Sequence, residues 1–358
     1  MRNFLIFLFL INLFSSAVYA QSSPADLLDL SLTELMDFEI KDKFSSDGSV
    51  AISSRWSLEY KYTYAKFRGF RDGTKDLSDD EVLFSAGEAR TSKNFKILPN
   101  NIRQEAHILN ISYAVNNLYF LTLGLPYIKQ STAHVSTVPN YGRFTIESAG
   151  VGDITLAASR LFRPSGKHLL TANAGVTLPV GAINKVGDTP RAAGNQPLPY
   201  TMQIGSGTYD LIPSLTYLST HQGVDWGVGG FAKVRLGRNE RGYRLGNRYQ
   251  MIGWAQGKWY KWVYPSLKVK ATYWQRITGE DEALNVPGSF PYPANVTDPS
   301  MFGGKKLTLQ FGTQFNLPGE SLQGSKIQFE FALPVYQNLN GPQAEEDFNF
   351  SLALNHRF

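Results

Sequence analysis

Residues 346–358 read EDFNFSLALNHRF. Phenylalanine or leucine occupies every second position from Phe348 to Leu354, and the positions between them are small or polar. An alternation of period two places apolar side chains on one face of a β-strand and polar side chains on the other. The stretch therefore predicts a strand that separates an apolar environment from a wet one.

The strand ends on Phe358, an aromatic residue. A last strand of this kind is typical of bacterial outer-membrane barrels, whose insertion machinery reads the terminal aromatic. We therefore assign Phe358 as an assembly signal and expect the C-terminal strand to bind the barrel-insertion machinery. The alternative is an edge strand of an ordinary sheet. It is disfavoured because the same alternation recurs throughout the chain.

The first recurrence begins near residue 52. Aromatic and leucine side chains from Trp56 to Tyr64 alternate there with Ser57, Glu59, Lys61 and Thr63, as expected for a strand with lipid on one side and a polar lumen on the other. Further candidate strands lie at 102–115, 118–128, 151–163, 167–180, 208–219, 224–236, 248–261, 264–278, 304–317, 325–337 and 347–358.

The connections between these candidates alternate strictly between long and short. The long connections fall at 68–101, 129–150, 181–207 and 279–303, those at 237–247 and 338–346 are of medium length, and short connections separate them. Short periplasmic turns and long external loops characterise outer-membrane barrels, which have even strand numbers. The predicted fold is therefore all-β, a transmembrane antiparallel up-and-down barrel of about 12 strands, with ten or fourteen as alternatives.

The N-terminal residues predict export. Residues 1–20 combine Arg2 with an apolar run from Phe4 to Phe14 and end on Ala20, which is the pattern of a signal peptide. No later segment offers the roughly 20 apolar residues that a spanning helix needs. The chain contains no cysteine, which excludes a lipid anchor at the cleavage site and any disulfide. We expect the protein in the outer membrane of a Gram-negative bacterium.

Residues 21–48 are expected to form a periplasmic segment with one short amphipathic helix. Ser31 and Glu34 form a capping box ahead of an apolar run. This segment is either a periplasmic leader or a plug in the lumen. The barrel is expected to occupy residues 49–358.

Several stretches rich in glycine and proline lie at the ends of the predicted strands. They are Gly69–Thr74 with Glu81-Val82-Leu83, Gly124–Tyr127, Gly150-Val151-Gly152-Asp153, Leu178-Pro179-Val180-Gly181, Gln203–Asp210, Gly242–Gly246 and Leu339–Gln343. Together they resemble a family of outer-membrane transporters catalogued as putative meta-pathway phenol-degradation proteins. The resemblance implies a barrel that moves small hydrophobic or aromatic compounds, and it implies no catalytic residues.

The polar faces of the predicted strands point into the lumen. A charge is tolerated on that face, whereas on the lipid face it costs about 2–4 kcal/mol at the membrane midplane. The inward charges either pair with one another and fill the barrel or form a positively biased path for anionic solutes. The residues assigned to this solute pathway are Glu59, Lys61, Asp210, Lys233, Arg235, Lys268, Lys270, Arg276 and Glu330.

Two other functions remain as alternatives. His134 and Ser136, with Asn140 nearby, have the residue types of a lipid hydrolase, in which they would lie together on the outer wall. The barrel could also be a closed structural one with binding loops. The acidic residues of the loop at 68–101 could hold Ca²⁺ or bridge lipopolysaccharide through divalent ions, but their spacing fits no EF-hand and a solvated loop is the default. No metal site or cofactor is therefore expected.

We therefore expect a channel or transporter for passive uptake or export of small organic solutes that are hydrophobic, aromatic or anionic, and not an enzyme. Its partners would be outer-membrane lipids, lipopolysaccharide and a small-molecule solute. The net charge of +5 comes from dispersed residues, and nothing in the sequence indicates nucleic-acid binding. The sequence leaves the oligomeric state open.

Overall fold

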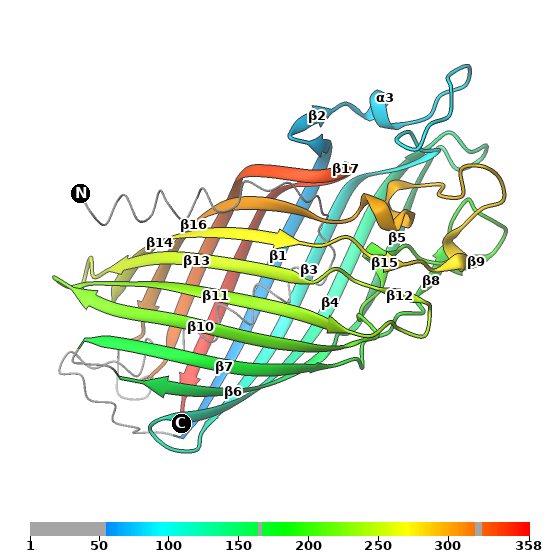
Figure 1. Cartoon of the computed structure of the whole chain (residues 1–358). Helices are drawn as coiled ribbons and strands as arrows, with labels where there is room; N and C mark the ends of the chain where they lie inside the picture. The colour runs from blue at the N-terminus through cyan, green and yellow to red at the C-terminus, as the bar shows by residue number, and fades with distance from the viewer. Residues whose placement is uncertain (1–54, 164–166, 319–323) are drawn as a thin grey trace.

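The computed structural model describes residues 55–163, 167–318 and 324–358 as a closed antiparallel β-barrel (Figure 1). The predicted signal peptide at 1–20 and the predicted periplasmic segment at 21–48 lie outside these residues. Within the described part, no helix has the length and apolar character needed to cross a membrane. The fold is thus the one that the alternating strands predict.

Long strands form the wall of the barrel. The short elements lie in the longer connections at one end, which we call the upper end, and the short turns lie at the other end. The wall strands are β1 (Trp56–Gly73), β3 (Ile97–Ala114), β4 (Tyr119–Ser136), β5 (Arg143–Val151), β6 (Ile154–Phe162), β7 (His168–Leu178), β10 (Tyr209–His221), β11 (Val224–Leu236), β13 (Arg248–Gly257), β14 (Val263–Trp274), β16 (Gly304–Asn316) and β17 (Lys326–Arg357). The short elements are β2 (Lys75–Leu77), α3 (Asp79–Val82), β8 (Val186–Asp188), β9 (Asn195–Pro197), η1 (Tyr200–Met202), β12 (Tyr243–Arg244), β15 (Thr278–Gly279), η2 (Glu282–Leu284), η3 (Asn295–Thr297) and η4 (Pro299–Met301).

The barrel closes where β17 meets β1. The ring passes through eleven of these twelve wall strands, because β5 and β6 pair with successive parts of β4 and β5 lies off the closed path. Every neighbouring pair in the ring is antiparallel. An odd number of antiparallel strands cannot close a ring, because direction must alternate around it. The ring can close because β17 contributes two arms of opposite direction. Its first arm pairs with β16 up to Leu339, and its second arm pairs with β1 from Leu339 onward. Figure 1 shows β17 doubling back. With its two arms counted separately, the ring has twelve strand segments.

The alternation predicted for the first strand is confirmed by the exposure of its side chains. Glu59 and Lys61 are each 4% exposed, whereas Tyr60 between them is 39% exposed. The same alternation runs along β4, where residues at even positions are buried. The charged groups in the first half of β1 therefore face the interior, and the outward side chains there are mostly apolar, as a lipid environment requires. The interior also holds apolar side chains, such as Phe120 and Ile128 of β4.

Aromatic side chains cluster on the outer face near both ends of the barrel. At the end that carries the short turns, the rings of Trp56 and Tyr113 lie 4.7 Å apart, and Trp259 in the β13–β14 turn is 81% exposed. Near the opposite end, Tyr249 and Tyr273 stack with their centroids 6.0 Å apart. Such pairs fit the interfacial aromatic girdles of a transmembrane barrel.

The predicted long loop at 129–150 is wrong. β4 continues to Ser136, and β5 returns along it, which leaves a connection of only a few residues between them. A transmembrane strand needs about 9–11 residues, and β4 has 18. Its upper half therefore stands above the apolar band. The first two outward side chains there, Lys129 and Ser131, are polar, so the alternation that marks the lower half is interrupted.

The predicted acidic loop contains α3, which begins at a capping box that includes a carboxylate. Ser78 and Glu81 form a capping box, and the Lys75 ammonium pairs with Glu81 at 2.7 Å. The bond from Lys75, followed by the bond from the Ser78 N–H, lowers the pKa of Glu81 from 4.5 to about 2. A depressed carboxylate pKa stabilises the fold above the unfolded value and loses that contribution as the pH falls towards 2.

We therefore expect hydrogen exchange at residues 79–83 to accelerate as the pH is lowered from about 5 to about 2, after correction for intrinsic exchange rates. Glu81→Gln, which cannot ionise, should exchange quickly at both ends of that range. Mass spectrometry of peptides from the protein in detergent measures this. Equal protection of the native segment across the range would contradict the role of Glu81.

Candidate solute pathway

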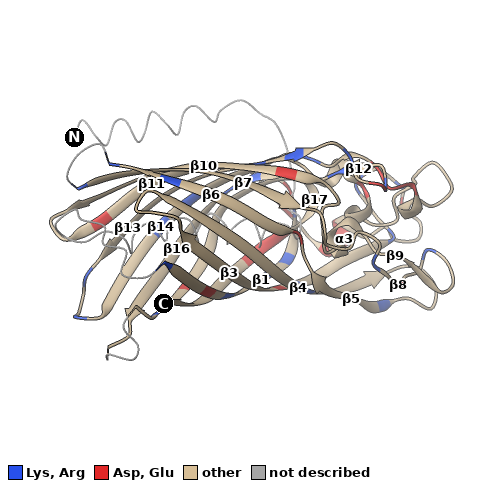
Figure 2. Ribbon diagram, turned by 90° about the horizontal axis from the view of Figure 1, so that it is seen from below, with Lys and Arg blue, Asp and Glu red and all other residues tan. Residues whose placement is uncertain are grey.

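Charged side chains line the inner wall at most of the predicted positions. Ribbon segments of both charge signs lie along the barrel strands in Figure 2. The structure brings these predicted residues, each less than 9% exposed, to the inner face: Glu59, Lys61, Asp210, Lys233, Arg235, Lys268, Lys270 and Glu330. Their assignment to a solute pathway remains a prediction.

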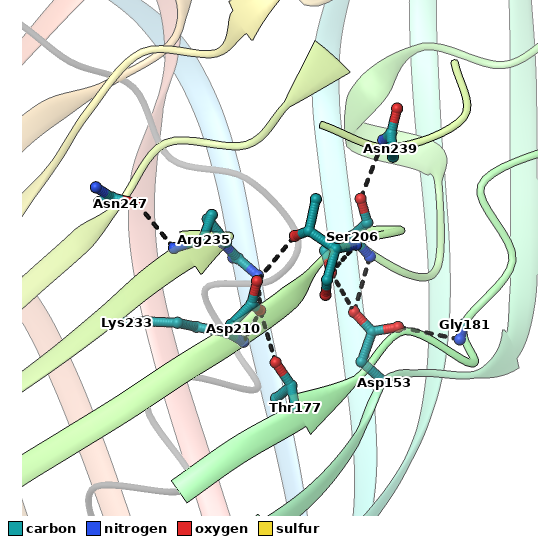
Figure 3. A network of polar contacts seen from close by, with 10 residues as sticks. Asp153, Thr177, Gly181, Ser206, Asp210, Lys233, Arg235, Asn239 and Asn247 are labelled. Carbon is teal, nitrogen blue, oxygen red and sulfur yellow. Dashed lines mark hydrogen bonds and ion pairs between the residues drawn. The ribbon is translucent and has the colours of Figure 1, made fainter. Parts of the chain in front are cut away.

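Asp210 is the centre of the densest group of these charges (Figure 3). Its carboxylate receives a hydrogen bond from Arg235 at 2.5 Å and one from Thr177 at 2.7 Å, and the Lys233 ammonium lies 3.7 Å away. Thr208 donates to the second carboxylate oxygen at 2.8 Å. Strand β10 thus supplies one carboxylate, its neighbour β11 supplies two cations, and its other neighbour β7 supplies a hydroxyl donor.

Other inward carboxylates are also paired. Lys268 contacts Glu330 at 2.6 Å, and Gln310 donates to the same carboxylate at 2.5 Å. Lys306 pairs with Glu346 in the same way. The mutual pairing considered from the sequence is therefore present among the described residues. Buried ion pairs of this kind are costly to break by removing one partner.

The connection between β7 and β10 crosses the mouth of the barrel. On one side, Ser148 of β5 donates to the Met202 carbonyl at 2.7 Å, and Gln130 of β4 donates to the Gln203 carbonyl at 3.3 Å. On the other side, the Tyr200 hydroxyl accepts a hydrogen bond from the Asp281 N–H at 2.8 Å. This segment, residues 179–208, therefore bridges the inner wall and the β14–β16 connection.

Asp153 anchors the bridge to the wall (Figure 3). Its carboxylate accepts hydrogen bonds from Gly181 N at 3.0 Å, Ser206 N at 2.8 Å and Ser206 Oγ at 2.6 Å. The two ends of the bridge meet there backbone to backbone. A Cβ added to Gly205 would lie 2.2 Å from the Gly181 carbonyl oxygen. The close approach therefore requires glycine.

Three of the glycine-rich stretches singled out in the sequence converge at this anchor. They are the stretches that end on Asp153, on Gly181 and on Asp210. Their composition indicated strand ends. Their meeting point carried no sequence signal, because a contact between residues so far apart has no local periodicity.

Arg276 differs from the prediction. β14 ends at Trp274, so Arg276 is exposed in the connection that follows and not in the lumen. It lines a cavity of about 830 Å³ at the upper rim together with Lys93, Asp72, Tyr273 and Asn340. The sequence pattern predicts a strand that continues to residue 278.

His134 and Ser136 do not form the site that a lipid hydrolase would need. Both lie on β4 and are buried on the inner side, at 4% and 8% exposure, and not on the outer wall. His134 stacks on Phe144 at 4.6 Å, and its Nδ1 is 3.1 Å from the Thr132 carbonyl. Ser136 Oγ accepts a bond from Val138 N. The geometry gives this alternative no support.

Phe358 stays a predicted assembly signal. Its side chain is 65% exposed and makes an edge contact with His356 at 4.6 Å. Its N–H donates to the Trp56 carbonyl at 3.1 Å, which joins the first and last strands at one end of their pairing.

Comparison with known proteins identifies the fold. No protein-family model matches the sequence, and a search of curated proteins finds no match. Among solved structures, an outer membrane channel from Pseudomonas putida F1 has a TM-score of 0.54 at 11% identity, over 85% of this chain and 96% of that one. The chain has the fold of an outer-membrane β-barrel channel.

Two further structures resemble the chain more weakly. A Pseudomonas aeruginosa FadL homologue has a TM-score of 0.41 at 9% identity, over 86% of this chain and 91% of that one. The Pseudomonas putida toluene transporter TodX has a TM-score of 0.40 at 9% identity, with the same coverage. Likeness at this level says nothing about the solute of this chain.

Proposed function

We propose that the protein is an outer-membrane channel for passive movement of small organic anions, such as hydrophobic or aromatic acids. The observation that carries the proposal is the charge of the inner face. Along the described wall of the barrel, buried cations outnumber buried carboxylates, whereas the β14–β16 connection outside the wall adds the buried Asp281 and Asp298. The cations are Lys61, Lys233, Arg235, Arg248, Lys268, Lys270 and Lys306, and the carboxylates are Glu59, Asp153, Asp210, Glu330 and Glu346.

A positive lumen favours anions, because rings of basic side chains lower the electrostatic barrier to anion passage. The ring of twelve strand segments encloses an interior between those of packed small barrels and open porins. The bridge at 179–208 narrows that interior at its mouth. This arrangement supports a selective route for small solutes over an open pore.

The resemblance to transporters of aromatic compounds supports the hydrophobic part of the proposal. The seven glycine-rich stretches that carry it run along nearly the whole barrel. A closed structural barrel would need neither an excess of inward cations nor a bridge held by a dedicated carboxylate.

Reversal potentials in planar bilayers test the proposal. The refolded protein should pass more chloride than potassium, and Lys270→Gln should lower the anion-to-cation permeability ratio by up to about fivefold, the effect of one charge near the path. Lys270 faces inward on β14. The matched control is Lys305→Gln on β16, whose side chain faces outward and which should leave the ratio unchanged. Silent or cation-selective wild-type protein would contradict the proposal.

A further inference from the structure

The outer wall carries a basic patch at the upper edge of its apolar band. Lys66 and Arg68 face outward from β1, and Arg103 faces outward from the neighbouring β3. The side chain of Arg68 is 64% exposed and that of Lys66 is 25% exposed. We call these three residues the outer basic patch.

The register of β1 and β3 places like charges opposite each other. Lys66 pairs directly with Arg103 across the two strands. Cβ atoms of directly opposed residues are about 4.5–5.5 Å apart, and like charges there destabilise a sheet. An anion between the two side chains would remove this repulsion.

The carboxylates near the patch leave it positive. A bulge in β17 opposite Lys66 turns Asp347 outward, where it lies 4.0 Å from Lys66 and 3.4 Å from Arg68. Arg103 has no ion pair with any residue in the described ranges, and the nearby Glu105 stands directly opposite Lys129. Asp347 thus contacts two of the three cations, Lys66 and Arg68.

The height of the patch matches the boundary of the membrane. Lys66 lies ten residues along β1 from Trp56, which belongs to the girdle at the short-turn end. Ten residues of strand span about 33 Å, or about 25 Å along the axis of a barrel whose strands tilt by roughly 40°. This equals the height of the apolar band, so the patch lies at its external edge.

An aromatic surface lies directly beneath the patch. Tyr64 stacks on Phe350 at 5.3 Å, and Phe348 stands opposite Lys66 in the register. An amphiphile with acyl chains on these rings would place its head group among the three cations. Basic clusters next to a membrane bind anionic lipid head groups in this way, with about 1 kcal/mol from each Lys or Arg.

We propose that Lys66, Arg68 and Arg103 bind the phosphate groups of lipid A, the anchor of lipopolysaccharide, on the outer wall of the barrel. Lipid A is the occupant that the position selects, because it combines phosphates with acyl chains in the external leaflet. The site is separate from the lumen and does not depend on the proposed channel function.

Titration of detergent-folded protein with bisphosphorylated lipid A, followed by native mass spectrometry, tests the site. Lys66→Gln/Arg103→Gln should weaken binding roughly 30-fold, as expected for the loss of two head-group contacts. The matched control Lys258→Gln/Lys261→Gln removes two exposed lysines at the opposite end of the barrel and should bind as wild type. Arg103→Lys keeps the charge and should bind nearly as wild type.

Heat-modifiable migration on gels shows that each variant is folded before it is titrated. Wild-type protein should lose affinity for lipid A from which both phosphates have been removed. Unchanged affinity of the folded double variant would overturn the proposal, as would phosphate-independent binding by the wild type. It would equally be overturned if phosphatidylglycerol bound as tightly as lipid A or if millimolar inorganic phosphate displaced it fully.

Discussion

Asp210→Ala is expected to destabilise the folded barrel by about 3–5 kcal/mol, because it leaves buried cations without their carboxylate. Asp210 is fully buried, and Arg235 and Lys233 are at most 3% exposed. The alanine also removes the acceptor for the Thr177 and Thr208 hydroxyls. Urea-induced unfolding from lipid vesicles, followed by tryptophan fluorescence, measures the change in free energy of unfolding.

Two further variants control this prediction. Asp188→Ala removes an exposed carboxylate that accepts one hydrogen bond from Tyr141, so its effect should stay below about 1.5 kcal/mol. Asp210→Ala/Arg235→Ala removes both members of the closest pair and should be less destabilised than the sum of the two single variants. A loss below about 1 kcal/mol for Asp210→Ala would show that the cluster is solvated rather than buried.

Gly205→Ala is expected to release the bridge from the wall and to raise single-channel conductance severalfold. The added methyl group would lie 2.2 Å from the oxygen and 2.5 Å from the carbon of the Gly181 carbonyl. Both are backbone atoms, so no side-chain rotation relieves the clash. Separating the two glycines also draws Ser206 and Gly181 away from Asp153.

The matched control for this variant is Gly142→Ala. Gly142 lies in the connection between β4 and β5, and an added Cβ there meets nothing within 4 Å. Asp153→Asn offers an independent route to the same release, because it weakens the acceptor of the three anchoring bonds. Wild-type conductance in a folded Gly205→Ala protein would mean that the bridge does not limit flow.

Strands that lie wholly within the apolar band were predictable from sequence. The bounds predicted for residues 224–236 coincide with β11, because its outward residues are apolar from end to end. β4 was cut short in the prediction at residue 128, since above that point lipid no longer selects apolar side chains. The extension of β4 to Ser136 depends on pairing with β3 and β5 instead.

The inward charges were also predictable, because the odd or even position of a residue along a strand fixes the face on which its side chain lies. Lys61 and Lys270 needed no tertiary information. The bridge could not be predicted, because it depends on a carboxylate at residue 153 meeting backbone N–H groups tens of residues later. Arg276 was misplaced because the period-two pattern continues past the point where β14 loses its partner.

The seam between β1 and β17 has a consequence for the order of folding. Its partners, such as Ser57 and Arg357, are about 300 positions apart in the chain. Contacts of such separation form slowly. Until they form, the first and last strands each expose a row of unpaired backbone groups that lipid cannot satisfy. The nascent sheet therefore has to be shielded along both open edges throughout its insertion, and completion of the seam is the step that ends this dependence.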